Sequence, residues 1–409
     1  MSREAPAGST TIVAVDTGGT FTDVVAVDAS GRIRNVKVPS TPDDPARAIL
    51  EGVRRVVPSG ERFVLLHGST VATNALLEGK GGEVLLVTTE GFEDVLEIGR
   101  QHRAQLYAFH PTRPAPLVPR ERRVGVPGRL GPDGHEIRPL DREALRALSR
   151  RAAQADAVAV VFLHSYAGEE HERVAGRILA ESGTPVSLSV DILPEFREYE
   201  RTATTVVNAY VQPVMADYLG RLEAAVASEA ERVQVMSSGG GLLPIERAAR
   251  EPVQTVLSGP AGGVVGAMRW GQAVGRSAIV TFDMGGTSTD VSLCPGRPLR
   301  TREFEIAGLP VAVPVLDIHT VGAGGGSIAE VDPGGALRVG PRSAGAVPGP
   351  ICYGRGGGEV TVTDAHLWLG RIPADTLLGG EYPLDRGAGA GALGELADRL
   401  GTTAERAAE

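Results

Sequence analysis

The stretch Asp16-Thr-Gly-Gly-Thr-Phe-Thr-Asp23 lies between two short apolar runs, at residues 12–15 and 24–27. The same pattern, D-x-G-G-T-x-T-D, returns at Asp283-Met-Gly-Gly-Thr-Ser-Thr-Asp290, again after an apolar run and before a valine. An apolar run, a turn with two glycines and a second apolar run predict a β-hairpin. Because six of eight positions agree in the same context, we interpret the two stretches as equivalent parts of two related halves.

The residue types in both hairpins favour a phosphate-binding site. Paired glycines let backbone N–H groups approach an anion closely, and threonine hydroxyls add hydrogen-bond donors. An aspartate at a strand end can hold hydrated Mg²⁺ or orient a water molecule, so Asp16 and Asp283 are the candidates for catalysis and for the metal. A pair of purely structural turns is the alternative. The candidate phosphate-binding residues are Thr17, Gly18, Gly19, Thr20, Thr22 and Asp23, together with Gly285, Gly286, Thr287, Thr289 and Asp290.

His67 is a further catalytic candidate, because it ends an apolar run at residues 63–66. In α/β folds, ligands collect at the carboxyl ends of strands. The alternative is structural: Ser69 or Thr70 caps the helix that follows, and His67 is packed in the core.

Asp317 and His319 stand two residues apart, so a strand would turn their side chains to the same side. Together they can bind a metal or move protons, although two ligands alone do not define a metal site. A hydrogen bond at a strand end is the alternative. The glycine-rich loop that follows offers many backbone donors, and Gly324 and Gly325 are its nucleotide-binding candidates.

Three other groups of residues have both a functional and a structural interpretation. Residues 258–263 open a helical stretch and can bind an anion there, or they allow close helix–strand packing. Arg100, His102, Arg103 and Arg113 can hold a substrate carboxylate, or they form a solvated surface. We expect Glu198, Glu200 and Arg201 to form surface ion pairs of little energetic weight.

Composition narrows the class of protein. The chain has 409 residues, of which 54 are Gly and 28 are Pro, and its formal net charge is −9. The length allows two or three domains, and the acidic balance argues against nucleic acid as the main partner. Two cysteines, Cys294 and Cys352, cannot form a disulfide framework, and we expect them to be buried thiols of a cytoplasmic protein. Since no run of about 18 apolar residues occurs, we expect no membrane span.

Apolar strands alternate with helical stretches along the chain, which predicts α/β architecture. The spacing predicts helices at residues 45–56 and 169–182 and a long helix at 201–226, interrupted at Pro213. Residues 100–140 have little periodicity and are predicted to form a long functional loop or a small subdomain.

The chain resembles the hydantoinase A / 5-oxoprolinase family over about residues 11–390. The stretches that carry the resemblance are VDTGGTFTDVV (15–25), HGSTVATNALLEGKG (67–81), LVTTEGFEDVLEIGRQ (86–101), SGPAGGVVGA (258–267), TFDMGGTSTDVSL (281–293), DIHTVGAGGGSIA (317–329) and GPICYGRGG (349–357). The resemblance implies an actin-like ATPase (ribonuclease H-like) fold with duplicated domains. It also implies an N-terminal domain at 11–200 and a core domain at 201–409, while the small and polar residues 1–10 predict a flexible tail.

Members of this family use ATP to open cyclic amides such as 5-oxoproline or hydantoins, and relatives carboxylate ketones. The resemblance therefore implies ATP and Mg²⁺ as cofactors, a cyclic amide as substrate and a hydantoinase B-like subunit as partner. A second divalent metal in that partner and a homo-oligomer are further expectations. Family members are usually longer, and the segment that contacts the adenosine would follow the end of this chain. The second half is therefore expected to be incomplete, which leaves a non-catalytic nucleotide-binding fragment as another alternative.

Overall fold

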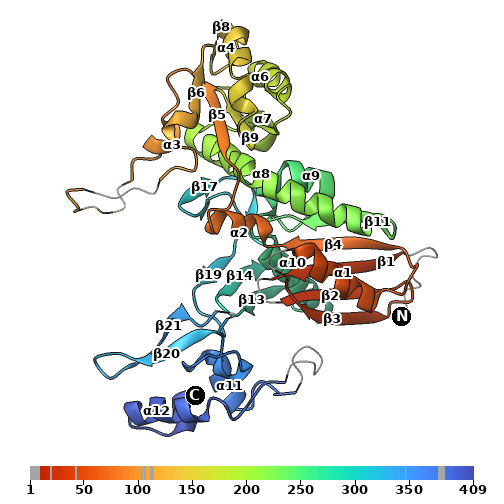
Figure 1. Ribbon diagram of the computed structural model, residues 1–409, viewed down its shortest axis with the longest axis vertical. Coiled ribbons are helices and arrows are strands. Elements are labelled where there is room, and N and C mark those ends of the chain that lie inside the picture. Colours follow the sequence, from red (N-terminus) through yellow and green to blue (C-terminus); the bar gives the residue numbers. More distant parts are fainter. Residues whose placement is uncertain are drawn as a thin grey trace.

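The computed structural model describes residues 10–18, 21–41, 44–102, 105, 107–110, 115–345, 347–375 and 383–409. Of the predicted tail, only Thr10 falls within this part of the chain, and Gly19, Thr20, Arg103 and Arg113 lie outside it. Helices and sheets alternate along the chain, as Figure 1 shows, which confirms the α/β class.

The first hairpin belongs to a six-stranded sheet with the order β12-β11-β4-β1-β2-β3. Strand β1 pairs antiparallel with β2 and parallel with β4, and β11 is parallel to β4 on its other side. This sheet therefore joins strands from before and after residue 200. Its bounds are β1 (Thr11–Thr17), β2 (Phe21–Val27), β3 (Ile33–Pro39), β4 (Phe63–Ser69), β11 (Ala230–Met236) and β12 (Leu242–Pro244).

One face of this sheet is covered by helices α1 (Pro45–Val56) and α8 (Glu198–Val226). Alternate residues of β1, such as Val13 and Val15, are buried and belong to the same core as Ile49 of α1 and Leu222 of α8. The period of two in the strand and the apolar stripe of the helix produce this packing. Helix α1 has the bounds predicted from its sequence.

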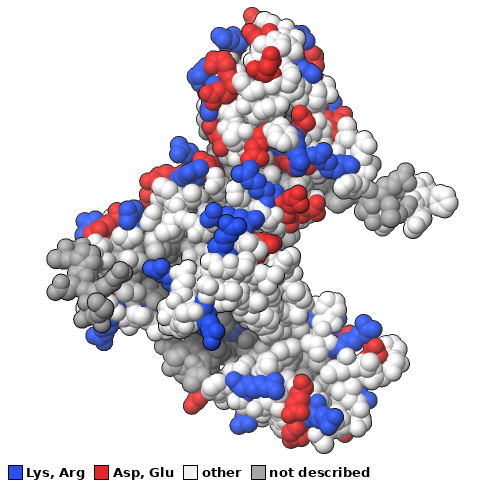
Figure 2. All heavy atoms as spheres, turned by 180° about the vertical axis from the view of Figure 1, so that it is seen from behind, with Lys and Arg blue, Asp and Glu red and all other residues white. Residues whose placement is uncertain are grey.

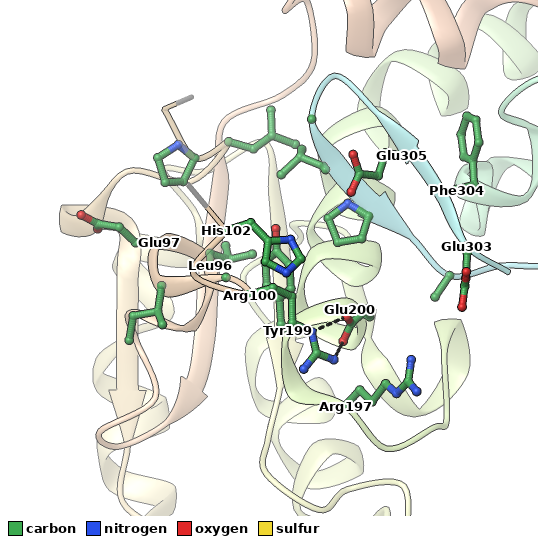
Figure 3. Close-up of a pocket in the computed structure, with 18 of the residues that line it drawn as sticks. Leu96, Glu97, Arg100, His102, Arg197, Tyr199, Glu200, Glu303, Phe304 and Glu305 are labelled. Carbon is green, nitrogen blue, oxygen red and sulfur yellow. Dashed lines mark hydrogen bonds and ion pairs between the residues drawn. The ribbon is translucent and has the colours of Figure 1, made fainter. Parts of the chain in front are cut away.

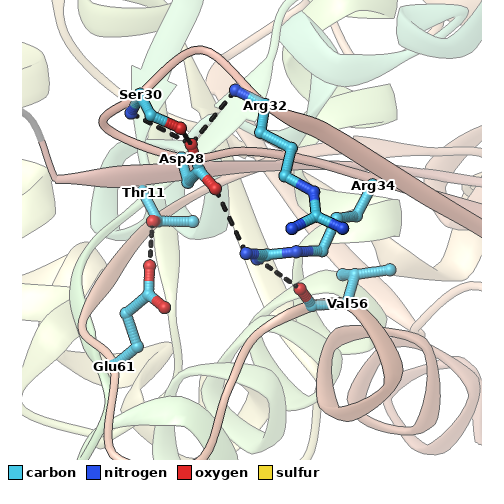
Figure 4. Close-up of polar contacts among 7 residues, drawn as sticks. All are labelled: Thr11, Asp28, Ser30, Arg32, Arg34, Val56 and Glu61. Atoms are coloured by element: carbon cyan, nitrogen blue, oxygen red, sulfur yellow. Dashed lines mark hydrogen bonds and ion pairs between the residues drawn. The ribbon is translucent and has the colours of Figure 1, made fainter.

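The turn between β2 and β3 is fastened to the end of α1, as Figure 4 shows. Asp28 accepts hydrogen bonds from the backbone N–H groups of Ser30 and Arg32 through Oδ1, and it pairs with Arg34 through Oδ2 at 3.1 Å. Arg34 also donates to the carbonyl of Val56, 3.1 Å away. A cation thus satisfies a carbonyl group at the C-terminal end of the helix, where the dipole is negative.

A second, smaller unit contains the four-stranded sheet β10-β9-β5-β6, in which all neighbouring strands are parallel. Its strands are β5 (Val84–Thr89), β6 (Arg123–Val126), β9 (Ala157–Val161) and β10 (Val186–Leu188). The residues of β5 and β9 are all buried, as expected for a parallel sheet covered on both faces. The other elements here are α3 (Val95–Ile98), η1 (Arg120–Arg122), β7 (Arg129–Leu130), β8 (Glu136–Arg138), α4 (Arg142–Ala147), α5 (Ser149–Ala152), α6 (Glu170–Ala180) and α7 (Ser189–Ile192).

Helix α8 joins the two units, and it differs from its prediction in two ways. It continues through Pro213 without a break. A proline removes one helical hydrogen bond, and the burial of residues on both sides of Pro213 outweighs that loss. The second difference is Arg201, which was expected on the surface but is 1% exposed.

Arg201 is buried because polar groups from the smaller unit surround its guanidinium. It donates to the hydroxyl of Ser165 and to the carbonyl of Phe162, the latter at 2.7 Å. Glu172 of α6, also buried, accepts from the hydroxyl of Ser189 at 2.6 Å and from the N–H of Phe162 at 2.8 Å. Burial raises the pKa of Glu172 and lowers that of Arg201, while each charge opposes the shift of the other. These residues form a buried charged network that attaches the smaller unit to α8.

The second hairpin lies in a three-stranded sheet, β13-β14-β19, which packs on helix α10. Its strands are antiparallel and are β13 (Ala278–Met284), β14 (Thr289–Pro295) and β19 (His319–Val321), and α10 spans Ser258–Ala273. The remaining elements are α2 (Val71–Leu77), α9 (Ile245–Arg250), η2 (Pro252–Thr255), β15 (Arg300–Thr301), β16 (Phe304–Ile306), β17 (Leu309–Val311), β18 (Val315–Leu316), β20 (Ser327–Val331), β21 (Leu337–Ser343), η3 (Ile351–Tyr353), α11 (Val362–Trp368), α12 (Ala390–Leu400) and α13 (Ala404–Ala408).

Charge is mixed over the surface. Figure 2 shows Lys and Arg side chains interspersed with Asp and Glu on the face behind that of Figure 1. Both cysteines are buried free thiols, as predicted. Among the described residues, no helix combines the length and the apolar character that a membrane span requires.

The buried network predicts a large stability cost when one charge is removed. Arg201→Met leaves Glu172 in the interior without its cation, and we expect the free energy of unfolding to fall by about 3 kcal/mol. Urea denaturation measures this change. Arg177→Met, which removes an exposed arginine paired with Glu170, should cost less than about 1 kcal/mol. Equal effects of the two substitutions would contradict the network.

His67 makes stability depend on pH. It lies on the buried face of β4, and its Nε2 is 2.6 Å from the Tyr218 hydroxyl. Burial lowers the pKa of His67 to about 4. Between about pH 6.5 and 4 the unfolded chain therefore binds a proton that the folded chain does not, so the free energy of unfolding falls as pH falls. We expect His67 to contribute up to about 1.4 kcal/mol per pH unit in this window.

Urea denaturation across this pH window tests the role of His67. His67→Gln should give a shallower dependence on pH than the wild-type chain, and His110→Gln, at an exposed position, should keep the wild-type slope. If His67→Gln also keeps that slope, His67 is not held neutral by burial.

Candidate functional site

The two hairpins have the same geometry. The backbone N–H of Gly18 donates to the carbonyl of Phe21 at 3.0 Å, and that of Gly285 donates to the carbonyl of Ser288 at 2.9 Å. In each hairpin the two aspartates of the motif are cross-strand partners: Asp16 faces Asp23, and Asp283 faces Asp290. The sequence repeat is therefore a structural repeat as well.

Helix α10 begins at the end of β4, beside the first hairpin, as predicted for residues 258–263. The Ser258 hydroxyl donates to the carbonyl of Ser69 at 3.0 Å, and the N–H of Ser69 points back to the same hydroxyl at 3.3 Å. The N–H of Leu257 donates to Oγ1 of Thr73 at 3.0 Å. These bonds fix the N-terminal end of the helix, which carries its positive dipole end, next to β1 and β4.

The first two turns of α10 present one face to both Asp16 and Asp283, because Gly259 and Gly263 are four residues apart and lie on the same side of the helix. A β-carbon at Gly259 would be 3.5 Å from Oδ1 of Asp16, and one at Gly263 would be 3.7 Å from Oδ2 of Asp283. At Gly68, which lies next to Gly259, the distance from such a β-carbon to the same Oδ1 would be 3.3 Å. The glycines therefore leave a narrow space around both carboxylates that side chains would fill.

The electrostatics of this space favour a cation. The pKa of Asp16 is raised, first because the surrounding chain displaces water and then because Asp23 and Asp283 add negative charge nearby. Lys37, which pairs with Asp23, acts in the opposite direction. A divalent ion between Asp16 and Asp283 would relieve the repulsion between the carboxylates.

The donor set fits Mg²⁺ better than a metal held wholly by protein. Among the described residues, no group of three or more His, Cys, Asp or Glu side chains could by itself hold a metal. Mg²⁺ usually keeps several waters and binds one or two carboxylates together with substrate phosphates. Asp16 and Asp283, which both lie beside the first two turns of α10, match that requirement.

Several predicted phosphate-binding groups already have partners. The Thr22 hydroxyl lies 3.0 Å from that of Ser40, and the Thr289 hydroxyl donates to the carbonyl of Ala323. Thr320 donates to Asp290 at 2.6 Å. These residues brace the hairpins, whereas Gly285, Gly286 and Thr287 are exposed, and Oγ1 of Thr17 is buried without a partner among the described residues.

The glycine-rich loop after β19 packs directly on the second hairpin. The N–H groups of Gly325 and Gly326 donate to the carbonyls of Gly285 and Gly286, at 2.9 and 2.7 Å. A β-carbon at Gly324 would come within 2.8 Å of the Gly285 carbonyl oxygen. Gly324 and Gly325 therefore lie next to the phosphate-type turn, where they support it, and the N–H of Gly325 is already used.

The structure does not bring the other predicted catalytic residues to the aspartates. His67 is buried on the α8 side of β4. His319 is opposite Val291, which faces Phe282, so it lies on the face of the sheet away from Asp283. Oδ1 of Asp317 is 3.7 Å from Nε2 of His319. Asp317 precedes β19, so the two residues do not lie in one strand as predicted. Lys37 was not predicted from the sequence as a site residue. The pairing of β2 with β3 places Lys37 opposite Asp23, and so brings a positive charge near Asp16.

A cavity of about 1130 Å³ lies at the N-terminal end of α8. Figure 3 shows its lining, where Arg100 makes two hydrogen bonds to Glu200, at 2.8 and 2.7 Å. The predicted basic patch is thus partly neutralised at Arg100. None of the residues that line this cavity belongs to either hairpin or to α10, so the cavity is distinct from the space around the hairpins.

Comparison with known proteins places the chain among longer relatives. The sequence profile of hydantoinase/oxoprolinase matches residues 201–409, and that of the hydantoinase/oxoprolinase N-terminal region matches residues 12–183. Caprolactamase subunit alpha of Pseudomonas jessenii is 39% identical over 96% of this chain and 59% of its own length. 5-Oxoprolinase 1 of Arabidopsis thaliana is 38% identical over 88% of this chain and 31% of its own length.

Solved structures agree with the sequence comparison. The ATP-dependent caprolactamase of Pseudomonas jessenii superposes with a TM-score of 0.82 at 38% identity, over 97% of this chain and 60% of that chain. Nucleotide-free acetone carboxylase superposes with a TM-score of 0.77 at 31% identity, with the same coverage. These neighbours confirm the actin-like ATPase fold, and the chain spans about 60% of their length. The chain belongs to the hydantoinase/oxoprolinase family.

Proposed function

We propose that this chain is the ATP-using part of an enzyme that opens a cyclic amide of the 5-oxoproline or hydantoin type. The observation that carries the proposal is the pair of equivalent hairpins with Asp16 and Asp283 beside the same face of the first two turns of α10. This arrangement suits a nucleoside triphosphate, because backbone N–H groups, a helix dipole and two carboxylates for Mg²⁺ converge on one space.

In this proposal the residues position charge and do no covalent chemistry themselves. The γ-phosphoryl group passes from ATP to the amide oxygen, which forms an imidyl phosphate and releases ADP. Asp16 and Asp283 would hold Mg²⁺ beside the phosphates, and the N–H groups of the exposed residues Gly286 and Thr287 would stabilise charge on the transferred group. Mg²⁺, when bound, supplies charge neutralisation for the triphosphate.

Ring opening then needs water. A first water adds to the activated carbon, and the ring C–N bond breaks as the nitrogen takes a proton, which leaves an acyl phosphate. A second water releases inorganic phosphate and gives the carboxylate. We assign these steps to a hydantoinase B-like partner, where a second divalent metal would activate the water. The relatives named as subunits support the presence of a partner.

A ketone carboxylase subunit is the second candidate, favoured by the likeness to acetone carboxylase. There the same phosphoryl transfer would activate a ketone for carboxylation. ATP consumption with the partner present, measured with 5-oxoproline, hydantoin, caprolactam, or acetone plus bicarbonate, separates the two. If only the ketone with bicarbonate stimulated ATP consumption, the assignment to a cyclic amide would be contradicted.

A cytoplasmic location of the protein remains a prediction.

Nucleotide binding tests the site in the chain by itself. Asp16→Asn or Asp283→Asn should weaken binding of a non-hydrolysable ATP analogue at least tenfold when Mg²⁺ is present, because each removes a charge that holds the metal. Without Mg²⁺ the same variants should bind about as well as the wild-type chain. Isothermal titration calorimetry gives both affinities.

Asp217→Asn, on the exposed surface of α8, is the matched control and should bind as the wild-type chain does. Wild-type affinity of both site variants in Mg²⁺ would refute the metal assignment. Failure of the wild-type chain to bind the analogue at millimolar concentration would refute the nucleotide site itself.

The open space that Gly263 leaves beside Asp283 can be tested by filling it with a side chain. Gly263→Val should abolish binding of the analogue, because its branched side chain would fill the space beside Asp283. Gly266→Val adds a valine one turn further along α10, where a β-carbon would meet nothing within 4 Å, and should leave the affinity within about threefold. Circular dichroism verifies that both variants are folded, and equal affinities would contradict the proposed position of the phosphates.

A further inference from the structure

The cavity at the N-terminal end of α8 has no role in the proposed nucleotide site. Its lining residues come from four segments of the chain, within 96–102, 115–117, 193–200 and 302–312. Small-molecule sites reach volumes of about 1000 Å³, and this cavity, at about 1130 Å³, has room for an organic molecule together with water.

Unusual backbone conformations gather around this cavity. Five of the described residues other than glycine have a positive φ, and three of them, Gln101, Arg197 and Ala307, belong to the lining. Ala307 lies in the tight turn between β16 and β17, where such angles are common. Gln101 and Arg197 have no such reason, and strained residues of this kind cluster at ligand sites. Their position favours a binding site over a simple gap in the packing.

Two of the three arginines in the lining are already neutralised. Arg100 makes its two hydrogen bonds to Glu200, and Arg302 pairs with Glu195. These two cations are therefore not free to hold an anionic ligand, and the predicted role of Arg100 in binding a substrate carboxylate is not favoured.

One cation and two carboxylates of the lining have no ion-pair partner among the described residues. The cation is Arg197, whose guanidinium lies 5.7 Å from the ring centroid of Phe196, and the carboxylates are Glu303 and Glu305. The pKa of Tyr199 is raised by burial and next by the charge of Glu305, so this carboxylate lies near the tyrosine ring. Figure 3 shows Glu305 on β16, across the cavity from the start of α8.

A ligand with an ammonium group and a carboxylate would satisfy both signs of unpaired charge. The Glu305 carboxylate, beside the hydroxyl and the ring face of Tyr199, suits an ammonium group, and Arg197 suits a carboxylate. Apolar side chains, those of Leu96, Leu117 and Leu309 among them, line the same cavity and can cover a hydrocarbon chain between the two charges.

We propose that this cavity binds the amino acid that is released when a lactam is opened, with the ammonium group at Glu305 and Tyr199 and the carboxylate at Arg197. This inference rests on the proposed function. Addition of water across a lactam C–N bond converts the carbonyl into a carboxylate and the ring nitrogen into an amine, which takes up the proton. A hydantoin would give a ureido acid, which has no ammonium group, so the cavity favours a substrate of the 5-oxoproline type.

Isothermal titration calorimetry of the 409-residue chain tests the proposal. The probes are L-glutamate and 6-aminohexanoate, the amino acids formed by opening 5-oxoproline and caprolactam. We expect at least one of them to bind saturably in the millimolar range or more tightly, and the corresponding lactam to bind at least tenfold more weakly. Hexanoate and hexylamine, which each carry one of the two charges, serve as partial ligands.

Two substitutions separate the two ends of the ligand. Glu305→Gln should weaken binding of the amino acid at least tenfold and leave hexanoate unchanged. Arg197→Asn should weaken binding of the amino acid to a similar extent and leave hexylamine unchanged, and asparagine tolerates a positive φ. Glu170→Gln, at an exposed position in α6, is the matched control and should bind all four compounds as the wild-type chain does.

Three results would overturn the proposal: no saturable binding of either amino acid, equal affinity for the amino acid and its lactam, or wild-type affinity of Glu305→Gln. Displacement of the amino acid by Mg²⁺ and a non-hydrolysable ATP analogue would overturn it as well, because the amino acid would then occupy the space around the hairpins. The proposed function fails separately, if the chain does not bind the ATP analogue, since binding of the amino acid is measured without nucleotide.

Discussion

The contact between Ser258 and Ser69 determines how the site is built. It attaches the first residue of α10 to the last residue of β4, with the Ser258 hydroxyl both donating to and accepting from the backbone of Ser69. Since β4 is paired with β1, the N-terminus of α10 is held beside Asp16. The same helix packs on β13 and β14, so it also sets where Asp283 lies. One helix therefore relates two hairpins that are far apart in the sequence.

Glycine serves several different purposes in this arrangement. At Gly259 and Gly263 it keeps the space beside the carboxylates open, and at Gly324 it lets one loop approach another hairpin more closely than any side chain would allow. The cost is that the aspartates stand near one another with little to neutralise them except Lys37, which already pairs with Asp23. A bound cation would relieve this repulsion, and in the proposed function metal binding would in this way be linked to nucleotide binding.

Much of the fold followed from local patterns. The strand–turn–strand repeat and the amphipathic stripe of α1 depend on neighbouring residues, so their sequence was sufficient to predict them. The burial of Arg201 and His67 depends on contacts with distant segments, Ser165 and Tyr218 among them, which no local pattern contains. The motif repeat was sufficient to select Asp16 and Asp283 together. It could not show that His319 lies on the opposite face of its sheet, because that depends on the register of β19 with β14. Whether Asp16, Asp283 and the hairpin residues bind nucleotide stays a prediction.

The central claim is that both hairpins hold one nucleotide. Amide hydrogen exchange in the presence of Mg²⁺ and a non-hydrolysable ATP analogue tests it most directly. The account predicts that exchange slows together in residues 16–23, 258–263 and 283–290, with a single affinity, and that the cavity lining around Arg100 and Glu200 does not change. Protection confined to one hairpin, or found only at that distant cavity, would contradict it.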